Sequence, residues 1–184
     1  MNTILSLLIF AMVVTPGVKI NPLFIGLSPL LNNDLGKICS EIAKKDAAAK
    51  WAVFGEAGAQ YLLKVWGIYV INGVKSIPDL DSMKIIDPNL ENRHIYNRYA
   101  HIVIFPGVNP EASFELPANR EDRYNIYIDP ASHELSKLGV KYVVFSGTPP
   151  YANREVLKKA GLKLLTEKPI NRCWICRLPD NDKI

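Results

Sequence analysis

Cysteine, histidine and runs of basic residues are all scarce in this 184-residue chain. It has three cysteines, and an odd number this low does not form a disulfide framework. Lysine and arginine number 22 against 18 acidic residues, and the longest basic runs are the pairs Lys44–Lys45 and Lys158–Lys159. Proteins that bind nucleic acid concentrate their cations on one face or element, so we expect no nucleic-acid partner.

The signatures of several enzyme classes are absent as well. The chain has no G-x-G-x-x-G, no G-x-x-x-x-G-K-[ST] and no G-x-S-x-G, which excludes the common Gly-rich phosphate cradles and the nucleophile elbow. Asp79-Leu80-Asp81 has the letters of a metal-binding D-x-D, but Pro78 favours a helix start there, with capping carboxylates. Cys173 and Cys176 form a lone C-x-x-C in a predicted strand, where their sulfurs point to opposite faces. We expect no cofactor, no metal site and no catalytic residue.

What the chain does have is apolar sequence, 48% in all, which is enough for a packed core and excludes a disordered chain. Residues 4–14 (ILSLLIFAMVV) are nearly all apolar. A membrane-spanning helix needs about 20 apolar residues, and a signal-peptide core about 7–15. A signal peptide is disfavoured because no Lys or Arg precedes this run and no cleavage pattern follows it; a core element is a third alternative. We expect residues 1–17 to be the end of a truncated transmembrane helix and residues 18–32 a connector.

Short strand and helix patterns alternate from residue 33 to the end. Strands are predicted at 51–54, 68–71, 99–105, 124–128, 140–145, 162–165 and 173–178. Helices are predicted at 33–50, 56–66, 130–138 and 150–160, and residues 72–97 read as irregular. Strands alternating with short helices indicate an α/β domain over 33–184 with a mostly parallel sheet flanked by helices. The last turn is short enough for an antiparallel C-terminal edge hairpin.

Polar and aromatic residues are densest at 92–101 (NRHIYNRYAH), just before and within the strongest predicted strand. Period-2 alternation places Tyr99 and His101 on one face of that strand. One interpretation is a network that holds segment 72–97 on the sheet. The other is a polar pocket for a sugar or a lipid-phosphate head group, with aromatic rings stacking on the sugar. The candidate binding residues are Asn72, Asp79, Asp87, Asn97, Arg98, Tyr99 and His101.

A series of short motifs gives the sequence a family resemblance. In order these are NGV at 72–74, PDL at 78–80, DP at 87–88 and YNRYAHI at 96–102. The series resembles the C-terminal soluble region of large bacterial integral membrane proteins that are relatives of GT-C-type glycosyltransferases or have no known function. The resemblance covers nearly the whole chain. It implies that catalysis belongs to the many-span portion and that this domain lies on the extracytoplasmic side of the bacterial cytoplasmic membrane.

The resulting hypothesis is a non-catalytic accessory domain of a membrane-embedded, glycosyltransferase-like protein. Its partners would be the membrane, through the N-terminal apolar segment, and a cell-surface glycan or lipid-linked sugar; scaffolding is the other role open to it. A free-standing small α/β enzyme and a purely structural interaction domain remain alternatives. In a doubly wound enzyme the ligand would bind at the carboxyl ends of the strands, after Phe54, Phe105, Ile128 and Phe145.

Overall fold

The computed structural model describes residues 5–7, 9, 10, 12, 28–55, 58–109, 111–147 and 154–179. The chain divides into two compact units, Met1–Asn32 and Asn33–Ile184. In the first unit the described residues from 5 to 12 are helical with exposed side chains, and α2 spans Ser28–Leu31. Most of the predicted membrane segment 1–17 and connector 18–32 lies outside the described residues. No helix within the described ranges has both the length and the apolar character needed to cross a membrane.

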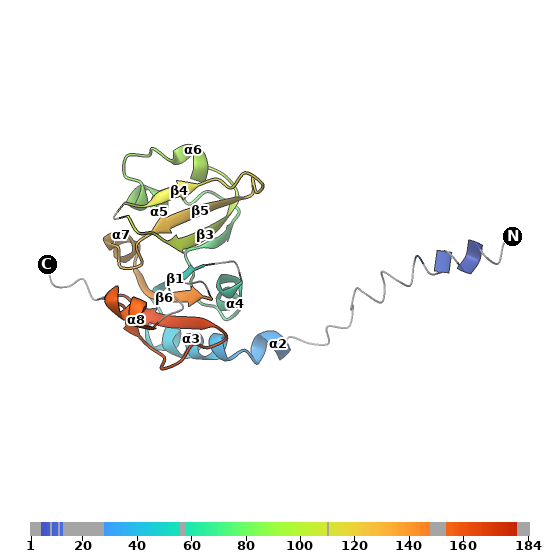
Figure 1. The fold of residues 1–184 in the computed structure, drawn as a ribbon, viewed down its shortest axis with the longest axis horizontal. Coiled ribbons are helices and arrows are strands. Elements are labelled where there is room, and N and C mark those ends of the chain that lie inside the picture. The colour runs from blue at the N-terminus through green and yellow to red at the C-terminus, as the bar shows by residue number, and fades with distance from the viewer. Residues whose placement is uncertain are drawn as a thin grey trace. The chain divides into compact units, whose positions relative to one another are not determined.

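The second unit is built around one sheet (Figure 1). Its described helices are α3 (Asp34–Lys45), α4 (Ala59–Val65), α5 (Leu80–Ile86), α6 (Arg93–Tyr96), α7 (His133–Lys137) and α8 (Arg154–Lys159). Its described strands are β1 (Lys50–Phe54), β2 (Gly73–Lys75), β3 (Ala100–Pro106), β4 (Ser113–Glu115), β5 (Arg123–Ile128), β6 (Val140–Ser146), β7 (Lys163–Leu164) and β8 (Cys173–Arg177). The strand order is β4-β5-β3-β1-β6-β8-β7, and β2 pairs with β3 outside this path.

The sheet is parallel in its centre and antiparallel at its edges. Strands β5, β3, β1 and β6 are parallel neighbours. Antiparallel pairs join β4 to β5, β2 to β3, β8 to β6 and β7 to β8. The predicted α/β class is therefore confirmed as a mixed sheet flanked by helices, in which the parallel arrangement holds for the four central strands.

The two faces of the sheet carry separate apolar cores. Helices α3 and α4 cover one face through Leu35 and Leu63, and helices α5 to α8 cover the other. Cys173 belongs to the first core and Cys176 to the second, so the sulfurs lie on opposite faces as alternation predicts. Burial raises the pKa of the Cys176 thiol to about 12. This thiol therefore remains protonated at neutral pH and serves the packing of the core.

Strand β1 pairs with β6 along its length but with β3 only at Phe54. The segment before β2 completes its remaining hydrogen bonds. The Trp51 N–H donates to the Tyr69 carbonyl, and the Ile71 N–H donates to the Trp51 carbonyl, both at 2.9 Å. The prediction of a full strand at 68–71 is wrong, because this pairing amounts to a single bridge between Trp51 and Val70.

Segment 72–97 is more regular than the sequence predicts, since it contains β2, α5 and α6. Two of these elements are helices of seven and four residues. Such short helices do not build up a recognisable 3.6-residue periodicity, and this explains why the pattern reads as irregular. Asp79 accepts a hydrogen bond from the Ser82 N–H and begins α5, so its predicted role as a cap is confirmed.

Candidate functional site

The seven predicted binding residues lie in three separate places. Asn72 lies beside β1. Asp79 and Asp87 flank the two ends of α5, on the face that α5 to α8 cover. The last four, Asn97, Arg98, Tyr99 and His101, lie at the start of β3. The structure therefore brings Tyr99 and His101 together but separates them from the two carboxylates.

Asn72 is 1% exposed and binds both backbone groups of Val53. Its side-chain oxygen accepts from the Val53 N–H at 3.0 Å, and its Nδ2 donates to the Val53 carbonyl at 2.9 Å. These two bonds replace the ladder partners that β3 does not supply at this position. The Asn72 amide thus serves the continuity of the sheet.

Asp79 and Asp87 both bind the backbone near them. At Asp79 burial acts to raise the pKa of the carboxyl, but hydrogen bonds from Ser82 and the attraction of Lys75 outweigh it and hold the pKa below its ordinary value. The ion pair between Lys75 and Asp79 measures 3.3 Å. Asp87 accepts from the N–H groups of Glu91 and Asn92 at 3.2 and 2.8 Å. Asp87 therefore holds the turn between α5 and α6.

His101 is the centre of a paired cluster at the start of β3. Its Nδ1 lies 2.7 Å from the Tyr61 hydroxyl, and its Nε2 lies 3.8 Å from a carboxylate oxygen of Asp122. The rings of Tyr61 and Tyr99 meet the imidazole edge-on, with centroids 6.3 and 6.4 Å away. The cluster fastens α4 and the turn before β5 to β3.

The two residues before Tyr99 add little to this cluster. Asn97 is exposed, and Arg98 donates from its guanidinium to the His94 carbonyl at 2.9 Å. The contacts at the start of β3 are thus mostly those of a network that orders the chain.

A polar groove opens instead at the carboxyl end of β3. Its volume is about 280 Å³, and we call it the carboxylate groove. It is lined from three parts of the chain: the end of α5 with the turn after it, the loop after β3, and helix α7. The lining residues are Ile86, Asp87, Pro88, Asn89, Glu91, Asn92, Glu111, Ala112 and Glu134.

Glu111 also lines a second cavity, of about 190 Å³, so this side chain borders both spaces. The second cavity includes Asn109, Ser113 and the half-buried Tyr127 of β5. Phe105 stacks on the Tyr127 ring with centroids 5.4 Å apart, and the Tyr127 hydroxyl donates to Glu115 at 2.6 Å. Both contacts fix the orientation of Tyr127. The second cavity thus has an aromatic wall held in one position.

Gly107 sets the distance between the loop after β3 and the end of β5. Its N–H donates to the Ile128 carbonyl at 2.9 Å. A Cβ added at Gly107 would lie 2.9 Å from the Ile128 nitrogen and 3.0 Å from the Tyr127 carbonyl carbon. Backbone atoms cannot move aside as a side chain can, so only glycine allows this approach. The loop that carries Asn109 and Glu111 therefore depends on Gly107.

Three carboxylates of the groove have no cationic partner among the described residues. Glu91, Glu111 and Glu134 form no ion pair with any residue in the part of the chain that the structure describes. Within the same residues, no three His, Cys, Asp or Glu side chains are placed to hold a metal ion together. What the groove offers is a set of hydrogen-bond acceptors and side-chain amides beside an aromatic ring.

Of these residues, only Asp87 was among those predicted from the sequence. Glu111 and Asn109 follow the Pro106-Gly107 break of the strongest strand, and Glu134 follows β5. The general rule that ligands bind at the carboxyl ends of parallel strands could have found them. The dense run of polar residues at 92–101 instead favours a site at the opposite end of β3.

The chain matches no curated protein and no solved structure. A family model described as "Domain of unknown function (DUF7654)" matches residues 29–179. That description names no activity, so the resemblance to relatives of GT-C-type glycosyltransferases stays a prediction. The match covers most of the chain, which therefore belongs to the DUF7654 family.

Proposed function

We propose that this chain is the glycan-binding accessory domain of a membrane-embedded, glycosyltransferase-like protein, and that it holds the glycan in the carboxylate groove. The observation behind the proposal is the set of unpaired carboxylates and amides that line the groove next to Tyr127. Sugar hydroxyls donate hydrogen bonds to such acceptors, and the C–H face of a pyranose packs on an aromatic ring. The domain binds the sugar and does not transform it.

The size and place of the groove support this proposal. The groove, of about 280 Å³, lies near the lower end of the range of roughly 300–1,000 Å³ that small-ligand sites occupy, and the second cavity, of about 190 Å³, shares Glu111 with it. The groove also lies where α/β proteins hold ligands, at the carboxyl ends of two parallel strands, β3 and β5.

A membrane tether fits the described part of the N-terminal segment. Leu7, Ile9 and Phe10 are helical and more than half exposed. Exposed apolar side chains at these helical residues favour burial in lipid. We place this segment in the bacterial cytoplasmic membrane and the α/β domain on its extracytoplasmic side.

Sugar binding is tested by titrating the full chain in a polyoxyethylene detergent, which has no sugar head group. The probes are glucose, galactose, mannose and N-acetylglucosamine, followed by saturation-transfer NMR. At least one sugar should bind, and Glu111→Ala should weaken it about ten-fold, because a buried sugar hydroxyl loses a charged acceptor. The control is Glu121→Ala, an exposed carboxylate in the turn before β5, which should leave binding unchanged. Failure of every sugar to bind, or equal effects of the two variants, contradicts the proposal.

The tether is tested by flotation of the full chain with liposomes. The unmodified chain should float with lipid, and a variant carrying Leu7→Asp and Phe10→Asp should stay at the bottom of the gradient, since each charge in hydrocarbon costs about 2.5–3.5 kcal/mol. Equal flotation of both chains rules out a tether through this segment.

The position of the groove at strand ends also favours a second candidate, a free-standing α/β enzyme. The two candidates differ in the fate of the sugar. NMR of an oligosaccharide incubated with the chain should show it unchanged if the domain only binds, and altered if the groove is catalytic.

A further inference from the structure

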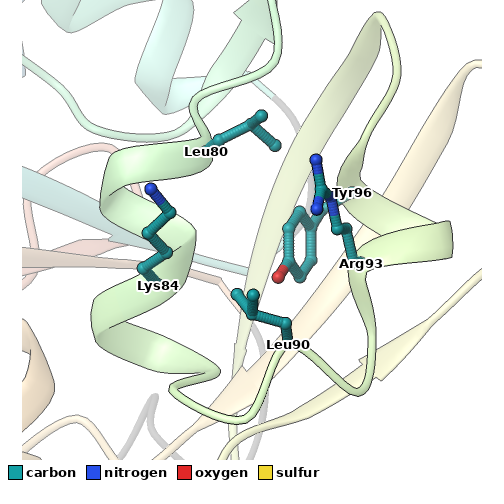
Figure 2. A pocket seen from close by; sticks show the side chains of 5 residues that line it. All are labelled: Leu80, Lys84, Leu90, Arg93 and Tyr96. Atoms are coloured by element: carbon teal, nitrogen blue, oxygen red, sulfur yellow. The ribbon is translucent and has the colours of Figure 1, made fainter.

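A small pocket on the other side of the α5–α6 turn has lining groups unlike those of the groove. It is lined by Leu80, Lys84, Leu90, Arg93 and Tyr96, with a volume of about 140 Å³ (Figure 2). Leu90 and Arg93 alternate along the chain with Asn89, Glu91 and Asn92 of the groove. Neighbouring residues of this turn therefore line the two spaces.

Every polar group of the pocket is a hydrogen-bond donor. Lys84 offers an ammonium group, Arg93 a guanidinium and Tyr96 a phenol. Figure 2 shows Lys84 lying along α5, across the space from Arg93 and Tyr96 on α6, with the Tyr96 hydroxyl pointing toward Leu90. A part of a ligand that fits this pocket must accept hydrogen bonds, and two cations favour a negative charge.

The strongest evidence for a ligand in this pocket is the buried hydroxyl of Tyr96. The residue is 1% exposed, and its hydroxyl has no hydrogen-bond partner among the described residues. Burial first, and then the charge of the nearby Asp87 carboxylate, raises the pKa of the phenol, which therefore remains protonated and able to donate. Each Asp87 oxygen already accepts one backbone N–H group but keeps a second lone pair, so a ligand oxygen would compete with Asp87 for the phenol proton. A buried donor without an acceptor costs free energy, which a ligand oxygen can recover.

The two cations are also available. Lys84 has a 3.5 Å ion pair with Asp81, whose side chain is 97% exposed, and such a surface pair contributes little free energy. Arg93 forms no ion pair with any described residue. Neither side chain is fixed by a strong partner.

The backbone of the turn holds Leu90 in the pocket wall at a cost. Its φ is +58°, in the left-handed region that a leucine rarely adopts. Its N–H donates to the Asp87 carbonyl at 3.1 Å. Strained backbone conformations persist where the surrounding structure holds them in place, and they are frequent at ligand-binding sites.

We infer that the pocket of Lys84, Arg93 and Tyr96 is a subsite for an oxyanion carried by the bound glycan, either a uronate carboxylate or a sugar phosphate. The inference rests on the proposed function, because the sugar ring would occupy the adjoining groove. The pocket, of about 140 Å³, has room for a group as small as a carboxylate or a phosphate. Leu80 and Leu90 provide apolar walls beside the two cations.

The test is calorimetric titration of the full chain, in the same sugar-free detergent, with glucose, glucuronic acid, glucose 1-phosphate and inorganic phosphate. One of the two charged sugars should bind about ten-fold more tightly than glucose, and the tighter of them identifies the oxyanion. A double variant, Lys84→Gln with Arg93→Gln, should reduce that affinity to the level of glucose and leave glucose binding unchanged. Tyr96→Phe should weaken the charged sugar about ten-fold, since it removes one hydrogen bond to a charged group.

The matched control replaces two exposed cations outside the pocket, Lys137→Gln with Arg120→Gln, and should leave the preference intact. Equal binding of glucose and both charged sugars overturns the subsite while the proposed function stands. If no sugar binds but inorganic phosphate does, and the pocket variants abolish that binding, the oxyanion site holds and the glycan proposal fails. Absence of all binding overturns both.

Discussion

The two ends of strand β3 use their polar side chains in opposite ways. At the start of the strand, His101 lies within 2.7 Å of the Tyr61 hydroxyl and close to Asp122, and Arg98 binds a backbone carbonyl. At its carboxyl end, Glu111 faces a groove and has no cation beside it among the described residues. Polar groups that find partners within the chain stabilise the fold, whereas unpaired ones at a concave surface remain free for a ligand.

This comparison explains why the two regions should respond differently to substitution. Loss of a paired group leaves its partner unsatisfied and lowers the free energy of unfolding. Loss of an unpaired carboxylate removes only repulsion among neighbouring charges and should alter binding alone.

The largest loss in the free energy of unfolding is expected from Asn72→Ala, because the Asn72 amide forms two buried hydrogen bonds. The Val53 N–H and carbonyl would both lose their bonds in a buried strand, at a cost of about 2–4 kcal/mol. Urea unfolding followed by circular dichroism measures this loss. Asn97→Ala, at an exposed asparagine, is the control and should change the stability by less than about 0.5 kcal/mol. Similar small effects of both substitutions would mean that Asn72 does not join β1 to its neighbours.

Gly107→Ala should have the second largest effect. It should lower the free energy of unfolding by about 1–3 kcal/mol, because the added Cβ clashes with the β5 backbone. The loop must also move away from β5, so sugar binding should weaken together with stability. Ile77→Ala changes a residue that is 77% exposed and lines neither cavity, and it should affect neither property. Normal sugar binding by Gly107→Ala would show that this contact does not shape the groove.

Replacement of the helix cap, Asp79→Ala, should cost about 1 kcal/mol. Because the folded pKa of Asp79 lies below its ordinary value of 3.8, its stabilising contribution is complete above about pH 4 and is lost as the pH falls through the folded pKa. Asp79→Asn keeps a capping oxygen but does not titrate, so it should flatten the acid limb of the stability profile. If the free energy of unfolding of this variant fell with decreasing pH as steeply as that of the wild type, the ionised Asp79 carboxylate would not contribute to stability.

The smallest loss is expected from Tyr61→Phe, about 0.5–1 kcal/mol, since it removes one half-buried hydrogen bond to His101. The imidazole signals of His101 should also shift in the NMR spectrum. Tyr69→Phe is the control, because the exposed Tyr69 meets Lys50 through its ring and not its hydroxyl. If the Tyr61 variant had wild-type stability and unperturbed His101 signals, the hydrogen bond between Tyr61 and His101 would not stabilise the fold.

The sequence predicted most of the fold because local patterns determine it. The alternation in 99–105 and 140–145, and the Gly139 stop before β6, are visible without any tertiary information. Segment 72–97 could not be assigned, because its helices are short and its regularity depends on tertiary contacts of β2 with β3 and of Met83 and Tyr96 with the core. Asn72 likewise looks like a turn residue until β1 is seen to lack a partner on its β3 side at Val53.

The site was harder to predict than the fold. A run of polar residues indicates where hydrogen bonds form but not with which partner. At 92–101 most of the polar side chains bond to other groups of the same chain. The groove comes from single residues far apart in sequence, Asp87, Glu111 and Glu134, which only the parallel arrangement of β3 and β5 brings to one edge. Whether a side chain is paired is decided by tertiary structure, and the sequence alone does not reveal it.

The most direct test of the contrast between the two ends of β3 is a paired measurement on a double variant, Glu111→Ala with Glu134→Ala. We predict a free energy of unfolding that is unchanged within about 0.5 kcal/mol or slightly raised, together with loss of sugar binding. A loss of stability as large as that of Asn72→Ala, with sugar binding intact, would contradict the assignment of these carboxylates to a ligand.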